Sequence, residues 1–485
     1  MTIIKDEKIE AYSLKNAVEH EGKAQAGAVL SSLFAEGLKK EEIKEIMPRI
    51  NNMLKKINSL SLEEQQSLFS KHEKQVSHRE TRAEDELPEL DNVNKTGVIM
   101  RFAPSASGIM HLGHILTGMP SSLYVKQYGG KFYVRIEDTN PEKCDPEAYT
   151  SFPKDCDWVF GNVSEYIIQS DRMEKYYTFA EELIKKGVAF VCTCKNEEDE
   201  EDQKSKKNSE ERKPREICKC RNNSIKENQE KWKKMLDKKG FKQGEAILRF
   251  KSPDTKLTNP ALIDFPLARI NETKHPRQGN KYRVWPLMNL CVTLDDLDYG
   301  MTHVIRAKEH RDNALRQEMI FKLIKKKAPL TYFLGRYKFD DLPLSKSRFQ
   351  EMIKRGEYSG WNDIRLPLAR NFKKRGYQPE AFGKLAIKRG LSEVDKVLKQ
   401  DDYFLELNNA NREIIKDKAI QTTFEEAKGK IKSNTEILMP NASIVKGNSD
   451  LNIKKLKEGD IIFFKGLGYV RFNKDEKIPF WFCHK

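Results

Sequence analysis

The sequence predicts a multidomain α/β protein organised around a parallel β-sheet. A strand, a helix and a second strand follow one another within residues 97–136, the order that begins such a sheet. Helical patterns occupy the N-terminal part, and alternating segments between glycines occupy the C-terminal part. The 485 residues suffice for roughly three domains, each with its own core.

Residues 1–92 are predicted to form a helical N-terminal domain. Apolar residues recur at helical spacing over Ala11–His20, Ala24–Glu36 and Lys40–Leu60, without strand-like alternation. The stretch Ser77–Asn94 is polar and charged, so we interpret it as a linker to the next domain.

The parallel sheet is predicted to begin directly after this linker. Gly97–Phe102 is expected to be a strand, Leu112–Tyr128 a helix and Lys131–Ile136 the next strand. Two later strand-like segments, Val284–Leu294 and Thr302–Ile305, are expected to complete the sheet.

Between the two parts of the sheet lies an insertion that contains a cysteine cluster and an acidic-then-basic run, Glu197–Arg215. Helices are predicted again over Asp312–Lys326 and Pro379–Leu398. The C-terminal part alternates around glycine turns, as in Asp460–Phe464 and Tyr469–Phe472, which indicates an all-β tail.

Composition narrows the class of protein. No apolar run is long enough to cross a bilayer, and the first twenty residues lack a signal-peptide core, so we expect a cytoplasmic protein without a membrane partner. The 88 Lys and Arg against 73 Asp and Glu favour a polyanionic partner, because phosphate contacts release counterions. A generally lysine-rich proteome would give the same excess, and composition leaves both readings open.

The segment from Arg101 to His114, RFAPSASGIMHLGH, carries the most information. It joins a strand to a helix at the carboxyl edge of the predicted sheet, where ligands bind and helix N-termini face anions. His111 and His114 fall on one face of the helix start, and Gly108 and Gly113 permit close approach of a nucleotide. Taken alone, a His-x-x-His pair is more often a pair of solvated or capping histidines, and metal binding is a further alternative.

A second motif, Leu342–Ser347, decides between these readings. The two segments together resemble the HIGH and KMSKS signatures of the class I aminoacyl-tRNA synthetases, matched by HLGH at His111–His114 and in part by LSKS at Leu344–Ser347. Pro343 stands where the family has its first lysine. The resemblance implies ATP with Mg²⁺ and catalytic roles for His111, His114 and Lys346. The residues implied to bind ATP are Pro104, Gly108, His111, Gly113, His114, Ser345, Lys346 and Ser347.

Within this class the chain resembles the archaeal-type glutamyl-tRNA synthetases. Arg101 matches the arginine that pairs with the substrate side-chain carboxylate, Glu137 the carboxylate that takes the amino group, and Arg306 an arginine facing the substrate carboxylate. The residues implied to bind glutamate are Arg101, Ala103, Ser105, Glu137 and Arg306. Bacterial members usually carry Tyr and Asn where this chain has Met288 and Val292, so those two contacts do not transfer.

The resemblance implies that the chain makes glutamyl-adenylate and transfers glutamate to the 3′ end of tRNA(Glu). Whether tRNA(Gln) is also charged stays open. The alternatives are a glutaminyl-tRNA synthetase, which shares both signatures, a non-catalytic tRNA-binding paralogue, and a zinc protein that binds nucleic acid. Arg306 and the residues after it favour the glutamyl branch, and the presence of all three catalytic residues argues against the paralogue.

The insertion is predicted to hold zinc. Two Cys-x-Cys pairs, Cys192 with Cys194 and Cys218 with Cys220, suit a closed tetrahedral site of four thiolates, which is a structural site. Four reduced cysteines without metal are the alternative. Glutamyl enzymes often carry zinc in the insertion that grips the acceptor end of tRNA, and this loop has too few apolar residues to fold alone.

The resemblance also implies a domain order. A Rossmann-like catalytic domain in two parts (93–188 and 281–350) flanks the zinc insertion (189–280). A helical stem-contact region (351–400) and a β-barrel anticodon-binding domain (401–485) follow, with Asp401–Leu407 as the first barrel strand. Residues 1–92 are either a docking element for a protein partner or a packed appendage, and we expect a monomer.

Overall fold

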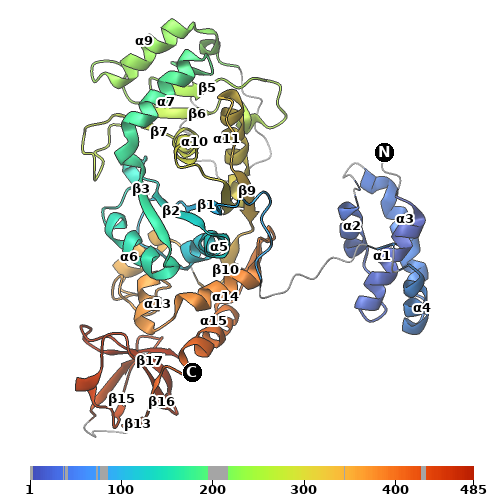
Figure 1. Cartoon of the computed structure of the whole chain (residues 1–485), viewed down its shortest axis with the longest axis vertical. Coiled ribbons are helices and arrows are strands. Elements are labelled where there is room, and N and C mark those ends of the chain that lie inside the picture. Colours follow the sequence, from blue (N-terminus) through green and yellow to red (C-terminus); the bar gives the residue numbers. More distant parts are fainter. Residues whose placement is uncertain are drawn as a thin grey trace. The chain divides into compact units, whose positions relative to one another are not determined.

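The computed structural model describes residues 4–36, 38, 42–72, 75–76, 86–194, 217–342, 344–427 and 433–485. The chain divides into two compact units, an N-terminal unit (Met1–Ala83) and a main unit (Glu84–Lys485) (Figure 1). Within these described ranges, no helix combines the length and apolarity needed to cross a membrane. The predicted run Glu197–Arg215 and residues 77–85 of the predicted linker lie outside the described residues.

The N-terminal unit contains four helices around a small apolar core. These are α1 (Asp6–Glu19), α2 (Ala26–Ala35), α3 (Ile43–Ile57) and α4 (Leu62–His72). Helix α3 buries Ile46, Ile50, Leu54 and Ile57, which recur at helical spacing. The predicted helices correspond to α1, α2 and α3. Helix α4 was not predicted because its one buried residue is polar: the Gln65 amide donates to the carbonyl of Ile57 at 2.8 Å.

A parallel sheet forms the centre of the main unit. Strands β1 (Val98–Phe102), β2 (Gly130–Ile136) and β3 (Val163–Ile168) pair in parallel in that order, and β8 (His303–Ala307) pairs in parallel with β9 (Leu330–Leu334). The Thr302 amide donates to the carbonyl of Ile99 at 2.9 Å, which places β8 beside β1. The helices α5 (Leu112–Tyr128) and α6 (Ala148–Phe160) connect β1 to β2 and β2 to β3. The predicted strand–helix–strand unit is therefore confirmed.

The insertion has its own antiparallel sheet and its own apolar core. Its strands are β4 (Ala189–Cys192), β5 (Ile247–Phe250), β6 (Pro266–Ile270) and β7 (Val284–Pro286). The helices that pack with this core are α7 (Met173–Lys185), α9 (Ile225–Leu236), α10 (Met288–Asp298) and α11 (Arg311–Leu323).

The prediction that a strand over Val284–Leu294 completes the parallel sheet is wrong. The segment is a strand only to Pro286, and that strand belongs to the antiparallel sheet of the insertion. Strand β7 ends at Pro286 and pairs antiparallel with β6, and the chain then enters helix α10. Leu290, Cys291 and Val292 are consecutive and all buried, so a helix enclosed on every side reads in sequence like a buried strand.

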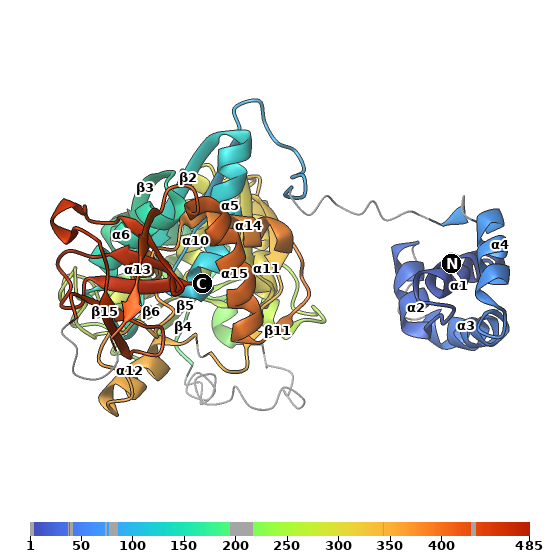
Figure 2. The same cartoon turned by 90° about the horizontal axis from the view of Figure 1, so that it is seen from below.

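After β9 the chain forms a helical region. It contains β10 (Tyr337–Phe339), α12 (Lys346–Lys354), α13 (Ala369–Arg375), α14 (Pro379–Arg389), β11 (Lys396–Leu398) and α15 (Gln400–Ile415). The expected barrel strand Asp401–Leu407 is wrong, since these residues lie in α15. Tyr403, Leu407 and Asn411 are buried four residues apart, and Asp401 lies in the first turn, where the helix dipole favours a carboxylate. Figure 2 shows α15 beside α14, with which it packs.

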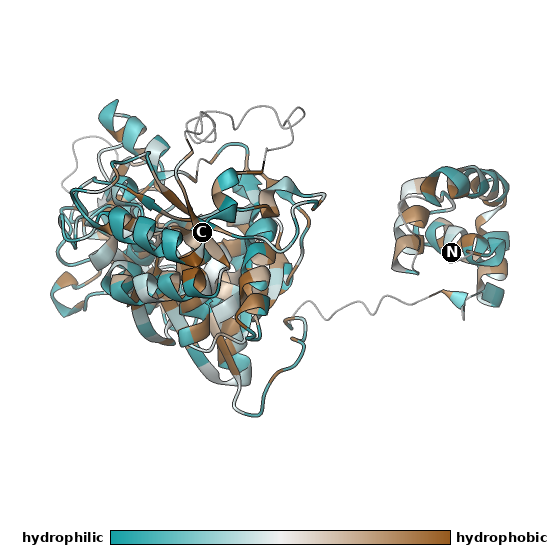
Figure 3. Cartoon of the chain, turned by 90° about the horizontal axis from the view of Figure 1, so that it is seen from above, coloured by the Kyte–Doolittle hydropathy of each residue, from teal (hydrophilic) through white to brown (hydrophobic). Residues whose placement is uncertain are grey.

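The C-terminal part is a barrel-like, mixed seven-stranded sheet in the order β12-β16-β17-β18-β14-β15-β13. Its strands are β12 (Ile420–Thr423), β13 (Glu425–Glu426), β14 (Thr435–Leu438), β15 (Ile444–Asn448), β16 (Ile461–Lys465), β17 (Gly468–Phe472) and β18 (Phe480–His484). The predicted strands near residues 460 and 470 are β16 and β17. Helix α13 packs on β17 and β18, where the Arg375 guanidinium donates to the carbonyl of Cys483 at 3.0 Å. Along the helices of both units, hydrophobic and hydrophilic residues lie side by side, as expected for helices that bury one face (Figure 3).

Candidate active site

The two histidines of the first motif form the start of helix α5. His111 is the N-cap: its Nδ1 accepts from the Gly113 amide at 3.1 Å, and the Nδ1 of His114 accepts from the His111 amide at 3.2 Å. The rings are stacked with centroids 3.9 Å apart. The two histidines can therefore cap the helix and also bind a ligand, because capping uses Nδ1 of each ring and leaves Nε2 for the ligand.

Burial decides the charge of these rings. It lowers the pKa of His111 to about 4, and burial together with the neighbouring His111 lowers the pKa of His114 well below its usual range. Both rings are therefore neutral near pH 7. Because Nδ1 accepts a backbone hydrogen bond in each ring, the proton of the neutral imidazole lies on Nε2, which can donate to an anion.

Lys346, from the second motif, contacts the loop of the first. It follows Ser345 at the start of α12, and its methylene chain crosses Gly108, where an added Cβ would lie 2.4 Å from Lys346 Cδ. Gly108 also has φ +153°, so glycine is required there both for its conformation and for space. The Lys346 ammonium pairs with Asp145 at 2.5 Å, and the Asp145 amide is bonded to the carbonyl of Ala106 in the same loop. Segments more than two hundred positions apart thus meet.

A cavity of about 350 Å³ lies at the carboxyl edge of the sheet between β1 and β8. The residues predicted to bind glutamate all line it: Arg101, Ala103, Ser105, Glu137 and Arg306. Its wall also includes Pro104 and His114 from the first motif and Met288 and Val292 from α10.

A second cavity of about 630 Å³ adjoins the first. It is lined by His111, Gly113 and Leu344, and the two cavities share His114, Thr117, Ala307 and Glu309. Gly108, Ser345, Lys346 and Ser347 line neither cavity; the Ser345 and Ser347 hydroxyls hydrogen-bond to each other at 3.0 Å. Pro343 lies outside the described residues.

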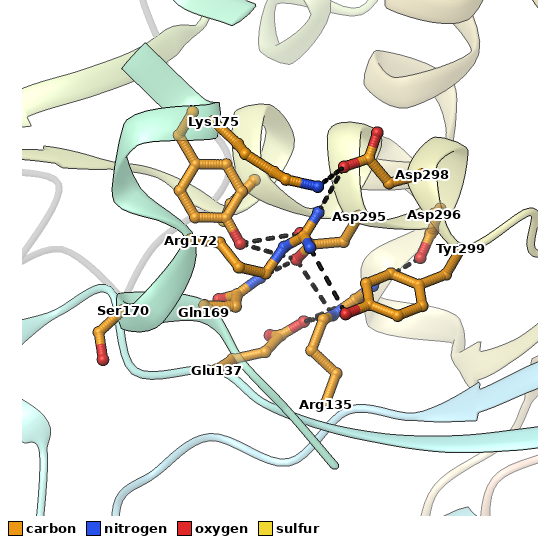
Figure 4. Close-up of polar contacts among 12 residues, drawn as sticks. Arg135, Glu137, Gln169, Ser170, Arg172, Lys175, Asp295, Asp296, Asp298 and Tyr299 are labelled. Carbon is orange, nitrogen blue, oxygen red and sulfur yellow. Dashed lines mark hydrogen bonds and ion pairs between the residues drawn. The ribbon is translucent and has the colours of Figure 1, made fainter. Parts of the chain in front are cut away.

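Sequence reasoning missed a buried network of charges beneath the first cavity (Figure 4). The fully buried Arg135 pairs with Asp296 at 2.6 Å, with Glu137 at 3.1 Å and with Asp295 at 3.8 Å. Asp296 also lies 3.6 Å from Arg101. The signal was present as two adjacent acids inside the apolar run that forms α10, since buried carboxylates need partners.

The cavity retains positive charge. Arg101 and Arg306 are both buried, and within the described part of the chain the Nε atom of each has no hydrogen-bond partner. Burial, followed by the nearby Arg101, lowers the pKa of Arg306 to about 9, because no carboxylate compensates its charge in full. Two such guanidiniums suit a ligand carboxylate, which can accept two hydrogen bonds from each fork.

The four cysteines of the insertion converge at the end of β4. The Sγ atoms of Cys192 and Cys218 lie 3.3 Å apart, those of Cys194 and Cys218 3.3 Å, and those of Cys194 and Cys220 3.6 Å. All four lie within 4.8 Å of one another. Four thiolates around zinc with about 2.3 Å bonds are about 3.8 Å apart, so this donor set fits one tetrahedral ion.

The chain is similar to a known family and to several known proteins. Residues 97–416 match the family of class I tRNA synthetases (E and Q), catalytic domain. A glutamate–tRNA ligase of Methanothermobacter thermautotrophicus is 38% identical over 412 residues, 84% of this chain and 71% of the relative. One of Methanobrevibacter smithii is 32% identical, with 99% of both chains covered. A solved structure of a glutamate tRNA ligase from Elizabethkingia meningosepticum, in complex with its amino acid, aligns with TM-score 0.47 and 18% identity over 66% of this chain and 70% of that one. The family match spans the sheet, both cavities and the insertion, and the chain therefore belongs to the class I tRNA synthetases of the E and Q group, with archaeal relatives.

Proposed function

We propose that this chain is a glutamate–tRNA ligase of the archaeal type. It activates L-glutamate with ATP to glutamyl-adenylate and pyrophosphate, and then transfers glutamate to the 3′ end of tRNA(Glu) with release of AMP. The observation that carries this proposal is the cavity that brings Arg101, Arg306 and Glu137 together beside His114. It offers two guanidiniums for the side-chain carboxylate and one carboxylate for the ammonium of glutamate.

The arrangement suits a reaction that depends on positioning. The α-carboxylate of glutamate attacks the α-phosphorus of ATP, and the bond to pyrophosphate breaks in line. Glu137 accepts a hydrogen bond from Arg135 through Oε1. Its Oε2 has no hydrogen bond to a described residue, so Oε2 can accept from the substrate ammonium. Arg101 and Arg306 take the oxygens of the side-chain carboxylate, which leaves the α-carboxylate free to face the second cavity.

The motif residues serve the nucleotide. The neutral His111 and His114 donate from Nε2 to phosphate oxygens at the N-terminus of α5, where the helix dipole also favours an anion. Lys346 leaves Asp145 for the polyphosphate as ATP binds, and its charge is most useful when negative charge builds on the leaving pyrophosphate. Mg²⁺ would bind as a complex with ATP, which needs no dedicated set of side chains.

Finer assignments follow from the same resemblance. We assign one structural zinc to Cys192, Cys194, Cys218 and Cys220, acceptor-end binding to the insertion, stem contacts to residues 351–400, and anticodon binding to the C-terminal sheet. tRNA(Gln) is a second substrate to be tested. We expect a cytoplasmic monomer, and residues 1–92 are the candidate docking element for a protein partner.

Exchange of labelled pyrophosphate into ATP tests the function directly. Exchange should depend on L-glutamate and reach full rate only with tRNA present, as the resemblance to this subclass implies. A preference for glutamine would identify a glutaminyl enzyme. Binding of tRNA without any exchange would identify a non-catalytic paralogue.

A further inference from the structure

We infer that Gln317 determines how strongly the amino-acid pocket prefers a carboxylate over an amide, because it holds Arg306 in place without neutralising it. This inference rests on the proposed function and assigns a positioning role to a residue outside both signatures. Gln317 lies on helix α11, in a part of the chain that lines neither cavity.

Arg306 has an unusual set of neighbours for a buried guanidinium. It lies on β8 and is 7% exposed, and its Nη2 donates to Gln317 Oε1 at 2.9 Å. This is the single hydrogen bond of its guanidinium to a described residue, and no ion pair of Arg306 occurs among them. Gln317 is 5% exposed and shares a buried helix face with Ala314 and Phe321, so its side chain has little freedom to move away.

The nearby acids are engaged by other arginines. Asp296 and Glu137 bind Arg135, and Asp295 is shared by Arg135 and Arg172 (Figure 4). Arg172 additionally pairs with Asp298 at 2.7 Å. The network beneath the pocket therefore neutralises Arg135 and Arg172, and it leaves the charge of Arg306 for the ligand.

The chemistry of Gln317 explains the choice of an amide. Its carbonyl oxygen orients the guanidinium through one hydrogen bond but carries no net charge. A glutamate of nearly the same shape at this position would form an ion pair with Arg306 and cancel the field that attracts a substrate carboxylate. Glutamine has a neutral side-chain amide, so its binding would weaken much less than the binding of glutamate.

The test is the variant Gln317→Glu in the full chain, assayed by pyrophosphate exchange with tRNA present. We expect the KM for glutamate to rise roughly 10–100-fold, while kcat stays within about threefold, because the lost interaction acts in substrate binding. The inhibition constant of glutamine, measured as a competitive inhibitor, should change by less than about threefold. The preference for glutamate over glutamine should therefore fall by nearly the same factor as the KM for glutamate rises. Gln421→Glu adds the same charge at an exposed position of β12 and should change neither value.

The variant Gln317→Met distinguishes the effect of charge from the effect of packing. It also provides a test if Gln317→Glu does not fold, which the melting temperature of Gln317→Glu will show. Gln317→Met removes the hydrogen bond but keeps the surroundings of Arg306 neutral. It should raise the KM for glutamate by less than about tenfold through poorer orientation of Arg306, and the preference over glutamine should persist. An unchanged KM in either variant overturns the inference. An equal loss of glutamate and glutamine binding in Gln317→Glu also overturns it, because it would indicate a purely structural role. Absence of glutamate-dependent exchange in the unaltered chain would instead refute the proposed function.

Discussion

The protonation of single residues decides what the nucleotide site can do. A charged imidazolium at His111 would attract phosphate more strongly, but burial makes that form costly and leaves a neutral donor. We propose that the lysine of the second motif provides the mobile charge instead. Its flexible stem reaches across Gly108, a position that would not admit any larger residue.

The depressed histidine pKa predicts acid sensitivity. The pKa of His111 is about 4 in the folded protein and about 6.5 when unfolded, so between these values the unfolded chain binds more protons. Stability should therefore fall as pH decreases through this window. Between about pH 7 and pH 5, the unaltered chain should lose roughly 1–2 kcal/mol more than His111→Gln, measured from urea midpoints of the main-unit transition. Equal losses in both proteins would show that the pKa of His111 is the same in the folded and unfolded states.

The second residue-scale prediction concerns Lys346. Lys346→Ala should slow adenylate formation roughly 10²–10³-fold, about 3–4 kcal/mol, with little change in the KM for ATP, because the charge acts mainly on the leaving pyrophosphate. Lys346→Arg should recover part of the rate. Single-turnover measurement with tRNA present is the direct assay, and Lys354→Ala at the exposed end of the same helix is the matched control. A variant that keeps its rate but loses ATP affinity would assign Lys346 to ground-state binding.

At the scale of elements, two connections position the chemistry. The turn from β1 into α5 presents the histidines. Helix α10 carries Met288 and Val292 into the pocket wall, and its Asp295 and Asp296 pair with the buried Arg135. Helix α10 packs in the same apolar core as the insertion, so the first cavity is lined by the parallel sheet and by a helix that packs against the insertion.

The insertion itself should depend on metal. The cysteine quartet ties the end of β4 to the short helix at Lys219–Asn222, and thiolates brought this close repel one another without a cation. Protein purified without chelator should contain one zinc per chain, and Cys218→Ser should lose it and unfold the insertion at lower temperature. Cys144→Ser, at a cysteine outside the quartet, should keep the metal. Zinc content near zero in the unaltered chain would leave four free thiols as the correct description.

At the scale of the whole molecule, the two units have separate cores. The apolar cluster of α1–α4 contains only residues of the N-terminal unit, and both cavities are lined by the main unit alone. A chain of residues 84–485 should therefore fold and keep glutamate-dependent exchange within about twofold of the full chain, compared at equal tRNA concentration. Loss of exchange in a folded truncated chain would show that residues 1–83 take part in activation.

Local patterns account for what sequence reasoning obtained. The strand–helix–strand unit, the two signatures and the paired cysteines are each encoded by neighbouring residues, so spacing and residue type reveal them without coordinates. Segments whose burial depends on distant partners were misread. Most of Val284–Leu294 was expected to be a strand, because a run of apolar residues does not show whether it will be buried as a strand or as a helix. Asp401–Leu407 was expected to be a strand from the family resemblance, and it lies in helix α15.

By itself the sequence determined that this is an α/β chain with a nucleotide motif, an amino-acid pocket and a cysteine quartet. The tertiary structure alone decided the charge of that pocket. Arg135, Asp296 and Gln317 lie in no recognisable motif and are brought together from β2, α10 and α11. Charge interactions in a buried site depend on distance and on access to water, and both are set only when remote segments pack against one another.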